Sequence, residues 1–163
     1  NIHGITNLIS QNSLYTINDA LTQFINDYIN YDVDLIVGHN LSFDINMIKV
    51  ELMREINSNK LNEEHFITFL HTLNYDITNR LYCTMQKSIE LCNLKMKSKF
   101  GREYLKFPKL NELHIQLFNS SPKNLHNSLN DVLICLRCYY MLEHKIDIIE
   151  IDDEIKCLLI DLI

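Results

Sequence analysis

The chain has 163 residues, an apolar content of 47% and a net charge of −6, values that are ordinary for one globular domain. No apolar run is long enough to cross a bilayer and no signal peptide opens the chain, so we expect no membrane partner. The net negative charge argues against a protein that holds nucleic acid mainly through its overall field. It leaves room for an enzyme that grips a few nucleotides through metal ions and a local basic strip.

The five cysteines show no spacing typical of a disulfide framework, which favours an intracellular, reducing compartment such as the cytoplasm or the nucleus. Cys135 and Cys138 form a single CxxC inside an apolar segment, without the second pair that a zinc site needs. The abundance of Asn and Ile would fit an AT-rich genome, including a viral one.

Apolar periodicity predicts a chain in which helices outnumber strands. In chain order, the pattern predicts a helix over 17–30, a buried strand over 34–37, helices over 42–56 and 64–72, a strand over 80–83, a helix through 85–92, a loop over 93–107, a helix from 110 to 117, a long helix over 127–143 and a helical tail over 144–163. We therefore expect an α/β fold.

The predicted loop over 93–107 mixes basic and aromatic side chains. It holds five cations and three aromatic residues, Lys95, Lys97, Lys99, Arg102, Lys106, Phe100, Tyr104 and Phe107. This mixture suits a nucleic-acid strand, because aromatic rings stack on bases and cations attract phosphates. Composition alone is equally compatible with a solvated surface loop.

The long helix over 127–143 is apolar nearly all round, with Asn130, Arg137 and His144 predicted to mark a narrow face toward water. Asp131 stands at the head of an apolar stripe, where an ionised carboxylate needs a partner. No basic residue follows at i+3 or i+4, so we expect a metal ion or a cation from elsewhere in the fold. His126, in the preceding loop, is placed to reach the same point.

A second acidic position follows the strand over 34–37, where the sequence reads Gly38-His39-Asn40-Leu41-Ser42-Phe43-Asp44. Asn40 and Asp44 come at the carboxyl end of the strand, and open α/β sheets keep their ligands at that end. An acid in the first turn of a helix also complements the helix dipole. Asp44 is therefore a candidate for either role.

These residues together resemble the DnaQ-like 3′→5′ exonucleases, in the branch whose last motif has a His five residues before its Asp. The matching segments are the turn Ile2-His3-Gly4-Ile5-Thr6, Asn40-x3-Asp44 after Gly38-His39, the helix start Phe107-Pro108-Lys109-Leu110-x-Glu112-Leu113, and His126-x4-Asp131. The resemblance covers residues 1–143 as an exonuclease domain and leaves 144–163 as a helical extension. It implies a ribonuclease H-like fold, with helices dominating around a reduced sheet.

The resemblance also implies a two-metal mechanism with Mg²⁺ or Mn²⁺ and assigns roles to residues. Asp44 and Asp131 match metal ligands, and His126 matches the general base that takes a proton from the attacking water. His3, Gly4, Ile5 and Thr6 would lie along the terminal nucleotide, with Asn40 and Phe43 helping to seat the 3′ end. The implied substrate is the 3′ end of a single strand, and a polymerase or an upstream domain of the same polypeptide is an implied partner.

One motif of that family has no match in this chain. Its D-x-E pair, which supplies the first two acids, belongs on a strand before the turn that matches residues 2–6, and the sequence given starts at that turn. Asp32-x-Asp34 lies at the wrong end of its strand, and Asp152-x-Glu154 would require a circular permutation. We therefore expect this segment by itself to lack metal-dependent nuclease activity.

Three functions stay open from the sequence. The first is a DNA 3′→5′ exonuclease for proofreading or repair, and the second is an RNA-trimming exonuclease that uses the same chemistry. Contacts to the 2′-hydroxyl would separate the two, and the sequence does not show them. The third is a non-catalytic nucleic-acid-binding module that keeps the fold. The retention of Asp44, Asp131 and His126 together favours an enzyme.

Overall fold

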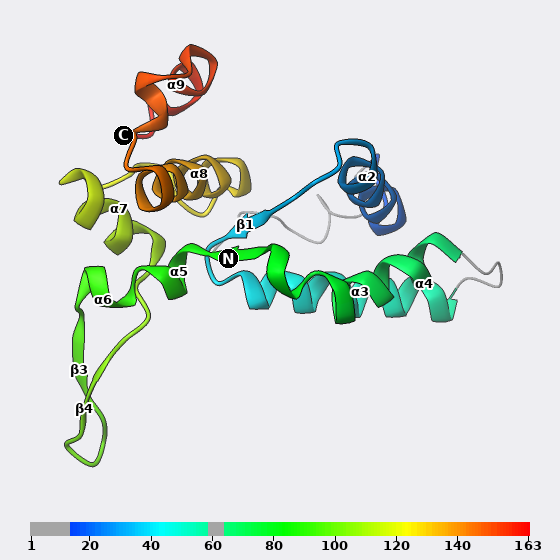
Figure 1. The fold of residues 1–163 in the computed structure, drawn as a ribbon, viewed down its shortest axis with the longest axis horizontal. Helices are drawn as coiled ribbons and strands as arrows, with labels where there is room; N and C mark the ends of the chain where they lie inside the picture. Colours follow the sequence, from blue (N-terminus) through cyan, green and yellow to red (C-terminus); the bar gives the residue numbers. More distant parts are fainter. Residues whose placement is uncertain (1–13, 59–63) are drawn as a thin grey trace. The chain divides into compact units, whose positions relative to one another are not determined.

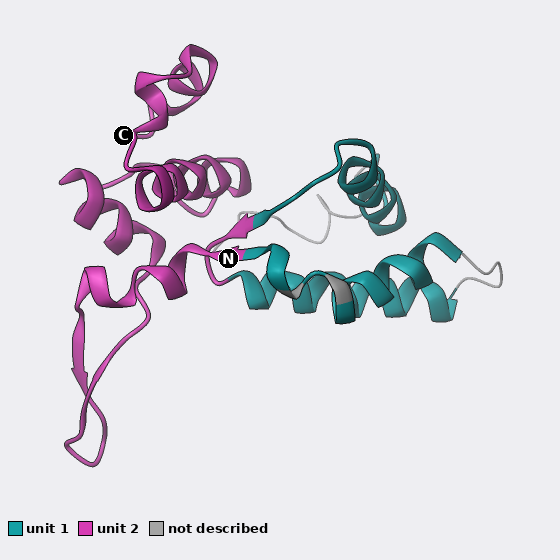
Figure 2. Cartoon of the chain, viewed as in Figure 1, with its two compact units in different colours: residues 1–36, 41–81 teal, residues 37–40, 82–163 magenta. Residues whose placement is uncertain are grey.

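The computed structural model describes residues 14–58 and 64–163, so the predicted turn at His3, Gly4, Ile5 and Thr6 lies outside the described residues. The chain divides into two compact units, residues 1–36 with 41–81 and residues 37–40 with 82–163 (Figure 2). We call them unit 1 and unit 2. The described residues form a mixed α/β structure in which helices predominate and sheet is small (Figure 1).

Unit 1 is built from helices. It contains α2 (Ile17–Asn30), α3 (Leu41–Ser58), α4 (Glu64–His71), a π-helical turn η1 (Thr72–Asp76) and a 3₁₀ turn η2 (Thr78–Arg80). Thr16 begins α2 with a capping box, in which its hydroxyl accepts from the Asp19 N–H and the Asp19 carboxylate accepts from the Thr16 N–H. The helices predicted over 17–30, 42–56 and 64–72 are confirmed.

The core of unit 1 is apolar and partly aromatic. Phe69 of α4 makes edge-to-face contacts with Phe24 and Tyr28 of α2, with ring centroids 5.8 and 5.2 Å apart. Leu52 of α3 and Phe66 of α4 are fully buried. The apolar face of each helix therefore packs as its sequence period predicts.

A two-stranded sheet pairs β1 (Ile36–Gly38) with β2 (Leu81–Cys83), close to the strands predicted over 34–37 and 80–83. The short helices α5 (Thr84–Lys87) and α6 (Ile89–Cys92) follow β2 directly. The sequence predicted one helix there. Two are formed because Ser88 interrupts the run, where its hydroxyl donates to the Thr84 carbonyl at 2.7 Å.

The remainder of unit 2 consists of β3 (Lys95–Lys97), β4 (Glu103–Leu105), α7 (Leu110–Phe118), α8 (Ser128–His144), a 3₁₀ turn η3 (Ile148–Glu150) and α9 (Asp153–Leu159). Its core joins α8 to both neighbours through Leu113, Ile134 and Leu159, which are fully buried. The predicted tail over 144–163 thus contributes to the same core as the long helix.

Residues 95–105 form an antiparallel hairpin, which corrects the predicted loop. Lys95 pairs with Leu105, Met96 with Tyr104 and Lys97 with Glu103. Gly101 closes the turn with a φ of 78°, a left-handed conformation that glycine adopts without strain. Basic residues have low strand propensity, so the sequence window did not reveal the pairing. Among the described helices, none has the length and apolar character needed to cross a membrane.

Candidate functional site

His126 and Asp131, both in unit 2, are brought together at the start of α8. His126 lies just before Asn127, the N-cap residue, and Asp131 lies in the first turn. The backbone N–H of His126 donates to Oδ1 of Asp131 at 3.2 Å. The side chain of His126 is exposed and that of Asp131 is half-buried. The two candidate residues are therefore linked through backbone geometry, with the imidazole free to face a ligand.

The backbone at His126 is held in the left-handed region, with a φ of 74°. Few residues other than glycine adopt this conformation, although His and Asn adopt it more often than most. The neighbouring bonds fix it: Asn127 Oδ1 accepts from the Leu129 N–H at 3.1 Å, and Asn130 Nδ2 donates to the Asn124 carbonyl at 2.9 Å. The loop that presents His126 is thus tied to the helix that carries Asp131.

Asp131 was predicted to need a cation. Among the described residues, no ion pair reaches its carboxylate, and the His126 N–H is a neutral donor. One backbone hydrogen bond leaves further lone pairs of this carboxylate available. Asp131 therefore keeps the coordination capacity that the predicted role requires.

His39 and Asn40, in unit 2, follow the end of β1. His39 Nε2 lies 3.0 Å from the Pro108 carbonyl, and Nδ1 lies 2.9 Å from Oγ1 of Thr84. Because a carbonyl only accepts, Nε2 carries the proton of the neutral ring, and Nδ1 shares the single proton of the Thr84 hydroxyl with the Gly38 carbonyl, which lies 3.2 Å from that hydroxyl. Burial lowers the pKa of His39, which favours this neutral form. His39 thus joins the strand end to the first residue of α5 and to the segment before α7.

Asn40 has a φ of 67°, the left-handed conformation that asparagine tolerates better than most residues. It turns the chain from β1 into α3, and its side chain is exposed. A polar amide is thereby displayed at the carboxyl end of the strand, as the sequence predicted.

Phe43 and Asp44 lie in the first turn of α3, in unit 1. The Phe43 side chain is 60% exposed. The Asp44 residue is exposed by area, yet neighbouring protein atoms desolvate its carboxyl enough to raise the pKa above its usual value. The two side chains are available for the predicted contacts.

The predicted site residues therefore fall into three sets. His126, Asp131 and Asn40 belong to unit 2, and Phe43 and Asp44 belong to unit 1. The segment His3, Gly4, Ile5 and Thr6 lies outside the described residues. Within residues 14–58 and 64–163, no three side chains of His, Cys, Asp or Glu gather into a metal-binding group.

Sequence reasoning missed a buried polar cluster around Arg137. This residue was predicted on a wet face of the long helix, and that prediction is wrong because Arg137 is buried. Its Nη1 donates to Nε2 of His114 at 3.0 Å, its guanidinium carbon lies 3.9 Å from the Phe118 ring centroid, and Asp147 pairs with it. A lone Arg within an otherwise apolar helix was the available signal.

The same helix departs from prediction at its N-terminal half. The helix was predicted to be apolar nearly all round with a narrow face toward water, but Leu129 and Val132, which are not on that predicted face, are 59% and 63% exposed. The helical period fixes which residues share a face, whereas burial depends on what covers that face. Apolar side chains at the head of α8 are therefore open to solvent in the described structure.

The CxxC of α8 lies within the core of unit 2. Cys135 and Cys138 are buried, and burial raises the pKa of the Cys138 thiol. The two cysteines act as small apolar core residues.

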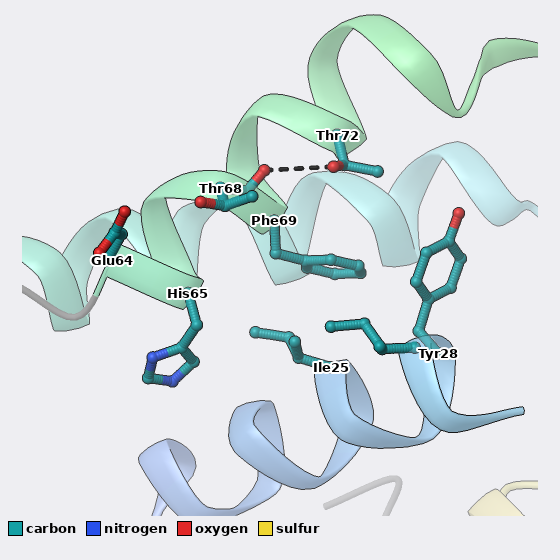
Figure 3. A pocket seen from close by; sticks show the side chains of 8 residues that line it. Ile25, Tyr28, Glu64, His65, Thr68, Phe69 and Thr72 are labelled. Atoms are coloured by element: carbon teal, nitrogen blue, oxygen red, sulfur yellow. Dashed lines mark hydrogen bonds between the residues drawn. The ribbon is translucent and has the colours of Figure 1, made fainter. Parts of the chain in front are cut away.

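Unit 1 contains a pocket of about 740 Å³ between α2 and α4. Figure 3 shows Ile25 and Tyr28 of α2 facing Phe69 of α4 across it. The pocket also has Ile29, Glu64, His65, Thr68 and Thr72 in its lining, and none of the predicted site residues is among the eight. It is mainly an apolar space between packed helices.

Comparison with protein-family models gave no match, and neither did comparison with curated proteins or with solved structures.

Proposed function

We propose that the protein is a 3′→5′ exonuclease that hydrolyses phosphodiester bonds from the 3′ end of DNA with two divalent metal ions, in proofreading or repair. The observation that carries the proposal is the link between His126 and Asp131, a 3.2 Å hydrogen bond from a left-handed residue to an acid in the first helical turn. Strained backbone that is held by surrounding bonds is characteristic of functional sites.

The chemistry of the two candidate acids supports the metal part of the proposal. Asp44 and Asp131 offer carboxylate oxygens, the ligands that Mg²⁺ and Mn²⁺ prefer. Bound metal ions would activate the water and stabilise charge on the phosphodiester oxygens. Residues of this chain would do the remainder: the exposed imidazole of His126 takes the proton from the water, and Asn40 with Phe43 positions the terminal nucleotide. The same chemistry would serve an RNA 3′ end.

A second candidate function is a nucleic-acid-binding module without catalysis. The hairpin formed by β3 and β4 favours it, because cations and exposed aromatic rings that could hold a strand lie there without any metal ligand. The two functions differ in one respect that can be measured: only the first needs Asp131 and His126.

The test is an exonuclease assay on the protein with any residues that precede Asn1 in its natural chain. Single-stranded DNA and RNA, 5′-labelled so that stepwise shortening of the 3′ end is visible, are incubated with Mg²⁺ or Mn²⁺. Asp131→Ala and His126→Ala should abolish shortening. Asp153→Ala and His144→Ala are matched controls, because Asp153 is also in the first turn of a helix and His144 is also exposed.

The outcomes separate the candidates. Shortening that only the two site variants abolish supports the exonuclease, and the preferred polymer decides between DNA and RNA. Absence of shortening with either metal, together with retained strand binding, would contradict the exonuclease and favour the binding module. Shortening that survives in Asp131→Ala would place the chemistry elsewhere.

A further inference from the structure

The hairpin of residues 94–106 has two chemically different faces. Successive residues of a strand point to opposite faces, and cross-strand partners share a face. Met96 and Tyr104 are partners, so they lie on one face together with Arg102. Lys95 and Lys97 lie on the other face with Leu105 and Glu103. We call the first of these, with Met96, Arg102 and Tyr104, the aromatic face.

Large apolar side chains on this hairpin are exposed. Phe100, at the tip, is 97% exposed, and Tyr104, on the aromatic face, is 48% exposed. Figure 1 shows the hairpin extending beyond α6 and α7. Lysines on exposed edge strands commonly prevent pairing with the strands of another chain. A fully exposed phenylalanine does not prevent such pairing. The exposed rings are available to a partner.

The turn holds the tip in one conformation. The Gly101 N–H donates to the Ser98 carbonyl at 2.9 Å, and the Ser98 N–H donates to the Arg102 carbonyl at 2.8 Å. At the base, Lys106 Nζ donates to Glu112 at 2.5 Å, and the same carboxylate accepts from the Lys109 N–H at 2.8 Å. The hairpin is therefore anchored to α7, and it presents Phe100 and Tyr104 from a fixed frame.

Charge selects the kind of partner. Residues 94–106 carry five cationic side chains and one acidic one, in a chain whose net charge is −6. Lys97 lies 3.8 Å from Glu103, and Lys106 is paired with Glu112. Within the described part of the chain, no ion pair engages Lys95, Lys99 or Arg102. These three cations are therefore available to a polyanionic partner.

From these observations we infer that the hairpin is a binding site for single-stranded nucleic acid, with bases stacked on Phe100 and Tyr104 and phosphates near Lys99 and Arg102. Rings that alternate with cations are the arrangement that unpaired strands use, since every base offers a π face and every link carries a charge. DNA and RNA share both features. The site goes beyond the proposed exonuclease, because it requires none of the metal-binding residues.

The absence of tryptophan from the sequence gives a direct test. Phe100→Trp in the full chain places a single tryptophan at the tip, which can be excited selectively over the eight tyrosines, and stacking on a base should quench its fluorescence. The titration uses oligothymidylate and oligouridylate of about 20 nucleotides, longer than the sites of many single-strand-binding folds. It is run in EDTA, so that failure of the exonuclease proposal would not affect it.

Variants separate stacking from charge. Phe100→Leu keeps an apolar tip without a ring, and binding should weaken roughly 5-fold or more, as loss of one stacked base predicts. The double variant Lys99→Ala/Arg102→Ala should weaken binding. A plot of the logarithm of the association constant against the logarithm of the salt concentration has a negative slope, and the variant should make this slope shallower by about 1.4. Lys123→Ala/Lys156→Ala removes two exposed lysines elsewhere in unit 2 and should bind as the original chain does.

Three results would overturn the proposal. The first is an unquenched tryptophan at saturating oligonucleotide. The second is equal affinity for inorganic polyphosphate, which has the charge of a strand without its bases. The third is binding to phosphatidylcholine vesicles containing phosphatidylserine in place of the oligonucleotide. Quenching by only one of the two oligonucleotides would support the site and identify its polymer.

Discussion

Arg137 of α8 donates two parallel hydrogen bonds to Asp147, from Nε to Oδ1 at 2.9 Å and from Nη2 to Oδ2 at 2.6 Å. The two side chains are 7% and 11% exposed. Asp147 also begins η3, where its carboxylate accepts from the Ile149 N–H. This ion pair therefore fixes where the chain turns after the long helix, and His114 and Phe118 extend its contacts to α7.

Arg137→Met should destabilise the fold by about 3 kcal/mol or more, because removal of one partner leaves the other charge nearly buried and unpaired. Urea unfolding followed by circular dichroism measures the loss. Glu103→Gln is the control, since it breaks the exposed pair with Lys97 and should change the free energy of unfolding by about 1 kcal/mol or less. Equal effects of the two substitutions would contradict the buried role of Arg137.

Stability should fall as the pH drops below about 6.5. Burial lowers the pKa values of His114 and His39 from the usual 6.5, with Arg137 adding to the effect at His114. The unfolded chain then binds protons that the folded chain does not, so acid favours unfolding. For each histidine, the free energy of unfolding should fall by at most about 1.4 kcal/mol for each unit by which the pH is lowered. Unfolding curves at several pH values give the slope, and His114→Gln should reduce it; a flat profile between pH values of about 5 and 7 would contradict the prediction.

Substitutions of His126 should affect stability and exonuclease activity differently. His126→Gly removes the left-handed strain and should be more stable than His126→Ala by about 1 kcal/mol. Both variants lack the imidazole, so both should lose exonuclease activity if the proposed function is right. Denaturant midpoints and the exonuclease assay are compared on the same preparations. An alanine variant as stable as the glycine variant would mean that the backbone relaxes when the ring is removed.

Substitutions of Asp131 should also affect stability and exonuclease activity differently. Asp131→Asn keeps an oxygen that accepts the His126 N–H, whereas Asp131→Ala removes it. We expect Asn to preserve stability and Ala to lose about 1 kcal/mol, the usual cost of a broken hydrogen bond at a helix start. Both should abolish activity, because a neutral amide is a poor ligand for a hard cation. Unfolding curves and nuclease assays together test the two expectations.

Local pattern predicted much of the secondary structure. The helix over 17–30 follows from apolar residues at i, i+3, i+4 and i+7, and Thr16 with Asp19 fixes its start. The long helix over 127–143 was placed within one residue of Ser128–His144. These features depend on neighbours within one or two turns, so a single sequence window contains the necessary information.

Contacts between residues that are far apart in the sequence could not be predicted from such a local window. The hairpin depends on pairing Met96 with Tyr104 across a turn, and the window showed only an unordered mixture of cations and rings. His39 is joined to Thr84 and Pro108, which lie 45 and 69 positions later. Neither partner could be chosen from the sequence, because the fold alone brings them into reach.

The sequence by itself determined the helices, the two short strands and the candidate residues His126, Asp131, Asn40 and Asp44, since periodicity, capping and motif spacing are local properties. Only the tertiary structure decided that Arg137 is buried against Asp147 and that Val132 is exposed. Both lie on the same helix, about 140° apart around its axis, and the period does not show which of the two faces another element covers. A residue is buried when another element covers its face of the helix. Which element does so depends on packing across the whole unit.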